Sequence, residues 1–192
     1  MTVTRNTAIV AAAVVVVVAI AVTAAMTGGV PLPHAVNTGP FGDGGVQGNQ
    51  CFVLRHPGEL VTDGENGVQD SGRQTAVIDS VTPIDPHGLR LISAYAVPDG
   101  DQSGQDLYGD QPGVPPKPPL LAEWSDRQDA DGARIPHGPG YRVFNLLLVM
   151  RTLGGIRSTD GGIDVCYHVG SQHYELRTGI GLEALVTSGS CP

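Results

Sequence analysis

Residues 164–177, "DVCYHVGSQHYELR", have the pattern of a β-hairpin and decide the fold class. Gly170 and Ser171 suit a two-residue turn, which places Asp164 opposite Arg177 at the far end of the hairpin. Strict alternation then divides the side chains between two faces. The apolar face predicts packing against a core, with two tyrosines stacked across the strands; it consists of Val165, Tyr167, Val169, Tyr174 and Leu176.

The polar face of this hairpin holds four potential metal ligands, namely Cys166, His168, His173 and Glu175. His168 is expected opposite His173, and Cys166 opposite Glu175, with Cβ atoms about 4.5–5.5 Å apart. Two imidazoles and a thiolate at that spacing can share one Zn or Cu ion. Polar residues also collect on solvated faces, so two interpretations stay open: a metal or thiol-redox site, or an ordinary exposed surface.

Other strand-sized runs of β-branched and aromatic residues, bounded by turn residues, cover residues 51–56, 74–83, 88–98, 141–153 and 181–186. In the run 88–98, simple alternation places Leu89, Leu91, Tyr95 and Val97 on one face. Six or seven strands without an amphipathic helix predict an all-β domain, specifically an antiparallel, immunoglobulin-like β-sandwich. The tyrosine-corner and Cys-Trp-Cys spacings of true immunoglobulin domains are absent, so the sequence predicts the architecture and leaves the topology open.

The N-terminal part contains a long apolar segment, residues 7–26, without a charged side chain. As a helix, this segment spans roughly 30 Å, the thickness of the hydrocarbon core of a bilayer. Arg5 precedes it, which predicts a short cytoplasmic tail (residues 1–6), one transmembrane helix and an exported remainder. The alternative is a signal peptide cleaved near Ala24 or Ala25, after which the domain is secreted.

The remainder of the chain divides into a predicted linker and one domain. Residues 27–50 are rich in Gly and Pro and predict a flexible tether, followed by a β-sandwich over residues 51–192. A long Pro-rich loop, residues 99–140, interrupts the domain. Its part from Pro112 to Trp124 is a candidate contact surface for an envelope protein or polymer, or a surface loop held by Trp124. "DADG" at 129–132 lacks the alternating acidic ligands of a calcium loop.

Charge and cysteine content limit the function further. The chain has 11 Lys and Arg against 19 Asp and Glu, a formal net charge of -8, which disfavours nucleic-acid binding. Three cysteines in an exported chain leave one unpaired. A disulfide between Cys51 and Cys191 is the preferred pairing, because it ties together the two ends of the domain, and Cys51 with Cys166 is the alternative.

Signatures of catalysis are weak. "QDSGR" at 69–73 resembles the sequence around a serine-protease nucleophile, but that chemistry requires a histidine base. The upstream histidines are His34 and His56, and His56 is too close in sequence to Ser71 for the usual two-barrel enzyme. No nucleophile elbow, phosphate-binding loop, dinucleotide fingerprint or zinc-protease motif is present. A hydrolase is therefore the weakest of the functional alternatives, and the sequence predicts a protein that is not an enzyme.

Three segments, "AVIDSVTPIDPHGLRLISAYAVP" (76–98), "NLLLVMRTLGG" (145–155) and "GIDVCYHVGSQHYELRTG" (162–179), resemble those of small membrane-anchored or exported actinobacterial proteins. In that uncharacterised group, "DPHGLRL" and a hairpin ending in "YxLRT" recur. The resemblance implies export and a β domain, and it carries over no catalytic or ligand residues. The expectation is an extracytoplasmic binding or structural module, with a metal-binding or thiol-redox protein as the alternative.

Overall fold

The computed structural model describes residues 35–42, 47–98, 111–114, 121–137 and 143–191. They belong to one compact unit, Ala35–Pro192, whereas the predicted tail and transmembrane helix lie outside the described residues. Within the described part, no helix combines the length and the apolar character needed to span a membrane. Strands dominate the unit, together with one short helix, α2 (Leu121–Ser125), so the all-β prediction is confirmed.

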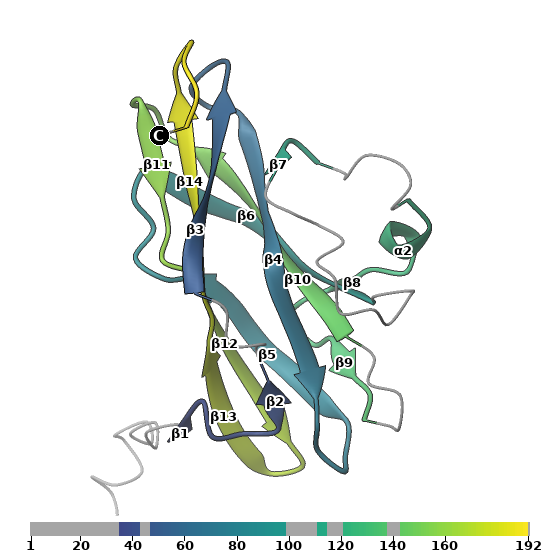
Figure 1. Ribbon diagram of the computed structural model, residues 1–192. Helices are drawn as coiled ribbons and strands as arrows, with labels where there is room; N and C mark the ends of the chain where they lie inside the picture. Colours follow the sequence, from purple (N-terminus) through teal and green to yellow (C-terminus); the bar gives the residue numbers. More distant parts are fainter. Residues whose placement is uncertain (1–34, 43–46, 99–110, 115–120, 138–142, 192) are drawn as a thin grey trace, which may run out of the picture. The chain divides into compact units, whose positions relative to one another are not determined.

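The strands form three sheets (Figure 1). Sheet A has the order β1 (Ala35–Val36), β13 (Gln172–Arg177), β12 (Ile163–Val169), β5 (Ala76–Pro83) and β9 (Arg134–Ile135). Sheet B has the order β2 (Phe41–Gly42), β4 (Leu60–Asp70), β10 (Val143–Thr152), β6 (Leu89–Pro98) and β8 (Gln128–Asp129), with β7 (Gln111–Pro112) paired to β4. Sheet C has the order β11 (Arg157–Thr159), β14 (Gly179–Val186) and β3 (Gln47–Leu54).

The core lies between sheet B and the other two sheets. One face of β10 contributes Phe144, Leu146, Leu148 and Met150 to a cluster that also includes Ile78 of sheet A and Leu182 of sheet C. The opposite face of β10 packs Leu147 against Val97, beneath Tyr95 and Trp124. Because β10 is covered on both faces, its sequence is a continuous apolar run rather than an alternating one. The strand predicted for residues 141–153 is thus present.

Sheet pairing is mainly antiparallel, as predicted, with two parallel exceptions. β1 runs parallel to β13, and β14 runs parallel to β3 over eight residue pairs that extend from Gly179↔Gln47 to Val186↔Leu54. These exceptions involve the N-terminal strands β1 and β3, which reach β13 and β14 from a distant part of the chain. Parallel strands cannot be joined by a tight hairpin, so local turn signals give no indication of such pairings.

Three expectations about boundaries and faces require correction. The flexible tether was expected to end at residue 50, but residues 35–42 and 47–50 contribute β1, β2 and the start of β3. β4 was not expected, because its sequence "LVTDGENGVQD" carries polar residues and glycines that resemble a turn. In β6, a register shift beside Ile92 moves Leu89 and Leu91 to the core face and Tyr95 to the outer face, so these residues do not share one face.

Candidate metal centre

The hairpin of β12 and β13 has the register that the sequence predicted. His168 pairs with His173, Cys166 with Glu175, and Asp164 with Arg177 across the strands. Gly170 occupies the turn with φ 61°, a left-handed conformation that glycine adopts without steric cost. The rings of Tyr167 and Tyr174 stack with centroids 5.4 Å apart on the core side. The two histidines therefore lie together on the opposite, outer face.

A third strand adds a ligand that the hairpin alone does not contain. β5 pairs with β12, and a register shift between Tyr167↔Ile78 and Cys166↔Ser80 leaves Asp79 between two paired residues. This β-bulge directs the Asp79 carboxylate over the outer face. Oδ1 of Asp79 lies 2.7 Å from Nδ1 of His168, and Oδ2 lies 3.3 Å from Nδ1 of His173. One carboxylate thus contacts both imidazoles.

The geometry of these three residues suits a metal ion. Each of Asp79, His168 and His173 offers one ligand atom, and these atoms lie within 4.8 Å of one another. The side chains are 36%, 30% and 55% exposed, respectively, so water and ions reach the site. Two imidazole nitrogens and one carboxylate oxygen are a donor set for Zn or Cu, and three protein ligands leave coordination positions open for water.

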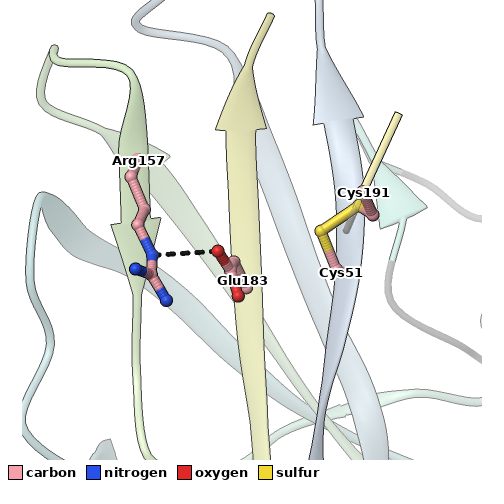
Figure 2. Close-up of a disulfide and its surroundings, with 4 residues drawn as sticks. All are labelled: Cys51, Arg157, Glu183 and Cys191. Carbon is pink, nitrogen blue, oxygen red and sulfur yellow. Dashed lines mark ion pairs between the residues drawn. A yellow bond between two sulfur atoms is a disulfide. The ribbon is translucent and has the colours of Figure 1, made fainter. Parts of the chain in front are cut away.

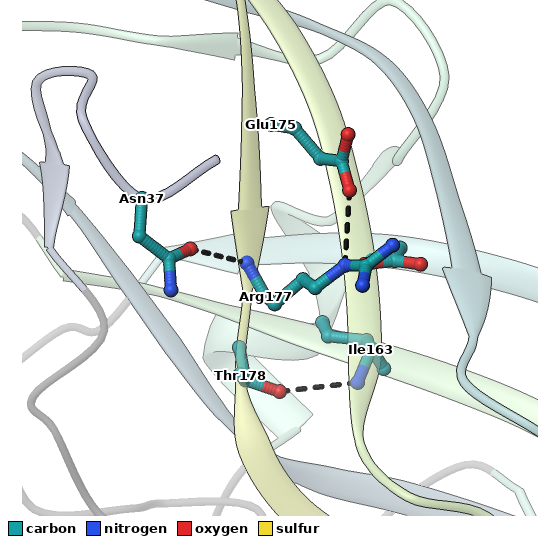
Figure 3. A network of polar contacts seen from close by, with 6 residues as sticks. Asn37, Ile163, Glu175, Arg177 and Thr178 are labelled. Atoms are coloured by element: carbon teal, nitrogen blue, oxygen red, sulfur yellow. Dashed lines mark hydrogen bonds and ion pairs between the residues drawn. The ribbon is translucent and has the colours of Figure 1, made fainter. Parts of the chain in front are cut away.

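The other two residues of the sequence-predicted set are engaged differently. Oε1 of Glu175 accepts a hydrogen bond from Nε of Arg177 at 2.9 Å (Figure 3). The same Nε lies 2.7 Å from Asp164, and the two carboxylates raise the pKa of Arg177, Asp164 contributing most. Cys166 is a half-buried free thiol. Among the described residues, neither Cys166 nor Glu175 belongs to the group of close ligand atoms.

The disulfide between Cys51 and Cys191 is present in the structure (Figure 2). Cys51 lies in β3, Cys191 follows β14, and their Cα atoms are 5.9 Å apart. Beside them on the same sheet, Nε of Arg157 forms an ion pair with Glu183 at 2.9 Å. The preferred pairing is thus confirmed, and Cys166 is the cysteine left over.

The remaining sequence candidates do not assemble into a site. Ser71 donates its hydroxyl hydrogen bond to the Pro40 carbonyl at 2.7 Å, and no described histidine is its hydrogen-bond partner. Residues 129–132 form the exposed end of β8 and a turn around the buried Ala130. Of the loop from Pro112 to Trp124, the structure describes residues 112–114, at the end of β7, and residues 121–124 of α2. The Trp124 ring packs edge-on against Tyr95, with ring centroids 5.2 Å apart.

Comparisons with known proteins add little to this description. No family model matches the chain, and no curated protein matches it. A solved structure with some similarity is a PapD-like (ASH) domain of human CEP192, PapD-like domain 7, at 11% sequence identity and a TM-score of 0.39. The similarity covers 79% of this chain and 87% of that chain. At that level it assigns no role to any residue of this chain.

Proposed function

We propose that the chain is a membrane-anchored, extracytoplasmic β-sandwich of immunoglobulin-like build that serves as a binding or structural module of the cell envelope. The observation that carries this proposal is the disulfide between Cys51 and Cys191, since structural disulfides persist in oxidising compartments outside the cytoplasm. The apolar segment 7–26 supplies the route of export and the anchor. The N-terminus stays in the cytoplasm and the domain lies outside.

Thiol trapping in intact cells tests this location. With the full chain, Cys51 and Cys191 are expected to resist alkylation until a reductant is added, while a chain without residues 1–26 stays in the cytoplasm with both thiols reactive. The mass of the mature protein then distinguishes an anchor from cleavage near Ala24 or Ala25. Reduced cysteines in the full-length protein would contradict export.

A second candidate function, divalent-metal binding, is favoured by the three ligand atoms of Asp79, His168 and His173. The close group contains Asp79, whereas the set predicted from the sequence contained Cys166 and Glu175. Variants of Asp79 and of Cys166 or Glu175 should therefore affect metal binding differently. Since imidazole and carboxylate bind metal only when deprotonated, affinity is expected to fall as the pH falls. A bound ion would also stabilise the fold, because the unfolded chain does not hold the three residues together.

Calorimetric titration of the detergent-solubilised full chain with Zn²⁺ and Cu²⁺ tests metal binding. We expect one ion per chain, loss of binding in a His168→Ala, His173→Ala double variant, and at least about tenfold weaker binding in Asp79→Asn. Cys166→Ser and Glu175→Gln are the matched controls and should bind as the wild type does. Absence of stoichiometric binding, or binding that survives the double change, would eliminate this function.

The contact surface proposed for an envelope protein or polymer is the loop from Pro112 to Trp124. Pro112 is exposed, and the Trp124 ring contacts Tyr95 of β6, so the end of this loop is held against sheet B. A photocrosslinking residue in place of Pro112 should capture a partner in intact cells, whereas the same residue at Ser188, beyond β14, should not. Equal capture at both positions would contradict the surface.

A further inference from the structure

Two arginines face each other at one end of sheet B. Arg90 of β6 and Arg151 of β10 are direct partners in the antiparallel ladder. Directly opposite residues project from the same face with Cβ atoms about 4.5–5.5 Å apart, and like charges in that arrangement repel. Both side chains are exposed. The two side chains therefore leave the sheet from the same face, side by side.

No described carboxylate forms an ion pair with either arginine. The ion pairs that arginines form in the described part of the chain involve Arg157 and Arg177, and neither Arg90 nor Arg151 has an acidic partner there. Arg151 instead donates from a terminal nitrogen to the neutral carbonyl of Gly58 at 3.3 Å. The chain contains 19 acidic side chains against 11 basic ones, so an adjacent pair of unneutralised cations is not a consequence of composition.

The backbone around the pair is fixed by hydrogen bonds between separate turns. Gly58 N donates to the Thr152 hydroxyl at 2.8 Å, and Thr152 N donates to the Glu59 carbonyl at 3.1 Å. Leu153 N donates to the Gly88 carbonyl at 2.8 Å. The turn after β3, the turn before β6 and the end of β10 are thus joined by hydrogen bonds. A site built on such a frame loses little conformational entropy when a ligand binds.

An apolar margin lies next to the pair. Leu153 and Ile156, in the turn between β10 and β11, are 61% and 78% exposed, which is unusual for side chains of this size in the described residues. Leu153 follows Arg151 by two residues, and its backbone N–H is bonded to the carbonyl of Gly88, two residues before Arg90. Ile156 follows later in the same turn. A ligand that carries both an anionic group and an apolar substituent would contact both features.

We propose that Arg90 and Arg151 form a binding site for a phosphate group, with Leu153 and Ile156 contacting an apolar substituent of a phosphate monoester. Guanidinium groups donate paired hydrogen bonds to phosphate oxygens. Two guanidinium groups together carry two positive charges, which match the doubly negative phosphate monoester better than they match a singly negative carboxylate. Binding removes the repulsion between the arginines. This site is independent of the metal site and of its ligands.

Titration of the solubilised full chain with inorganic phosphate and with phenyl phosphate tests the proposal, at constant ionic strength and with a metal chelator present. We expect saturable binding of phosphate, binding at least about tenfold weaker in Arg90→Gln and in Arg151→Gln, and no binding in the double variant. Arg134→Gln, an exposed arginine on β9, is the matched control and should bind as the wild type does. Acetate should bind more weakly than phosphate.

The apolar part of the site is tested separately. Phenyl phosphate should bind more tightly than inorganic phosphate, and a Leu153→Ser, Ile156→Ser double variant should abolish this preference while retaining phosphate binding. Thermal unfolding checks that each variant is folded, and phosphate should raise the melting temperature of the wild type but not that of the Arg90→Gln, Arg151→Gln variant. Equal phosphate binding, or an equal rise in melting temperature, in wild type and double variant would overturn the proposal.

Discussion

Thr178 stands in a buried chain of hydrogen bonds between sheets A and B. Ile163 N donates to the Thr178 hydroxyl at 3.1 Å (Figure 3). That hydroxyl donates to Oδ1 of Asn66 at 2.6 Å. Nδ2 of Asn66 in turn donates to Oδ1 of Asp63 at 2.7 Å. Buried polar groups are costly unless they are hydrogen-bonded, and here each donor meets an acceptor. This series of hydrogen bonds explains why β4 has polar residues in the interior.

We expect Thr178→Val to lower the free energy of unfolding by about 2 to 4 kcal/mol, because the backbone N–H of Ile163 and the amide oxygen of Asn66 both lose their partner. Thr178→Ser keeps the hydroxyl and should cost much less. Urea denaturation of both variants measures the difference. Equal destabilisation by the two changes would show that the methyl group of Thr178, not its hydroxyl, is what matters.

Asp160 is a buried carboxyl whose charge is only partly compensated. It is 2% exposed, and its Oδ1 accepts hydrogen bonds from Gly162 N and Leu182 N, each at 3.1 Å. Burial raises the pKa of Asp160 from 3.8 to about 6, and the two hydrogen bonds oppose that rise. Among the described residues, its Oδ2 has no hydrogen-bond partner.

This raised pKa predicts a stability that falls as the pH rises. Between 3.8 and about 6 the native state keeps a proton that the unfolded chain has released, so the free energy of unfolding falls across this range and stays lower above it. The full loss in the free energy of unfolding is about 3 kcal/mol. Asp160→Asn cannot ionise, so its stability relative to the wild type should improve by that amount from about pH 4 to about pH 7. Urea denaturation across this range measures it, and a constant difference would contradict the prediction.

At the scale of elements, the turn between β11 and β12 depends on one of two adjacent glycines. Gly162 has φ 106°, and a Cβ there would lie 2.5 Å from the Thr178 carbonyl oxygen. A Cβ on Gly161 would have its nearest contact at 3.5 Å, with a side-chain atom of Ile84. Both the backbone strain and the steric clash of an added side chain therefore arise at Gly162 and not at Gly161.

Gly162→Ala is expected to lower the free energy of unfolding by at least about 2 kcal/mol, through backbone strain and displacement of the start of β14. Gly161→Ala is the matched control and should change it by less than about 1 kcal/mol. Thermal or urea unfolding of the two variants gives the comparison. If both substitutions were tolerated equally, the conformation of this turn would not be required.

Two β-bulges determine which side chains meet on the outer faces of the sheets. The bulge on β5 brings Asp79 to His168, and the register shift in β6 separates Leu91 from Tyr95. Each bulge compensates for a mismatch with a partner strand that is distant in the sequence. The alternation of side chains within one strand does not indicate where such a mismatch occurs. The sequence accordingly did not indicate Asp79 as a neighbour of the two histidines, and the predicted faces of β6 were wrong in part.

At the scale of the whole molecule, the Cys51–Cys191 disulfide closes a loop with a sequence separation of 140 residues. Restricting the unfolded chain over such a loop contributes about 5 kcal/mol by the loop-entropy relation. Reduction, or a Cys51→Ser, Cys191→Ser double change, should lower the free energy of unfolding by up to that amount. Urea denaturation with and without a reductant measures the effect.

A Cys166→Ser variant is the control for this prediction. It retains the disulfide and should lose stability on reduction as the wild type does, whereas the Cys51→Ser, Cys191→Ser variant should not respond to the reductant. Loss of the response in Cys166→Ser would indicate that Cys166 takes part in the bridge.

The sequence by itself determined the all-β class and the hairpin register, and it favoured the Cys51–Cys191 disulfide while leaving Cys51–Cys166 as an alternative. These features depend on local signals: a two-residue turn at Gly170, alternation of apolar and polar side chains, and cysteines near both ends of the domain. The register follows because a turn of fixed length fixes every pair beyond it. His168 and His173 were therefore placed together correctly.

Only the tertiary structure decided what lies beside that hairpin. Asp79 is 89 residues from His168, β1 and β3 pair in parallel with strands from the other end of the chain, and Arg90 meets Arg151 across separate strands. Pairings between distant strands depend on the packing of the whole core and on bulges that relieve mismatches there, and local alternation does not encode either. The hairpin thus supplied two candidate ligands, and the fold supplied the third.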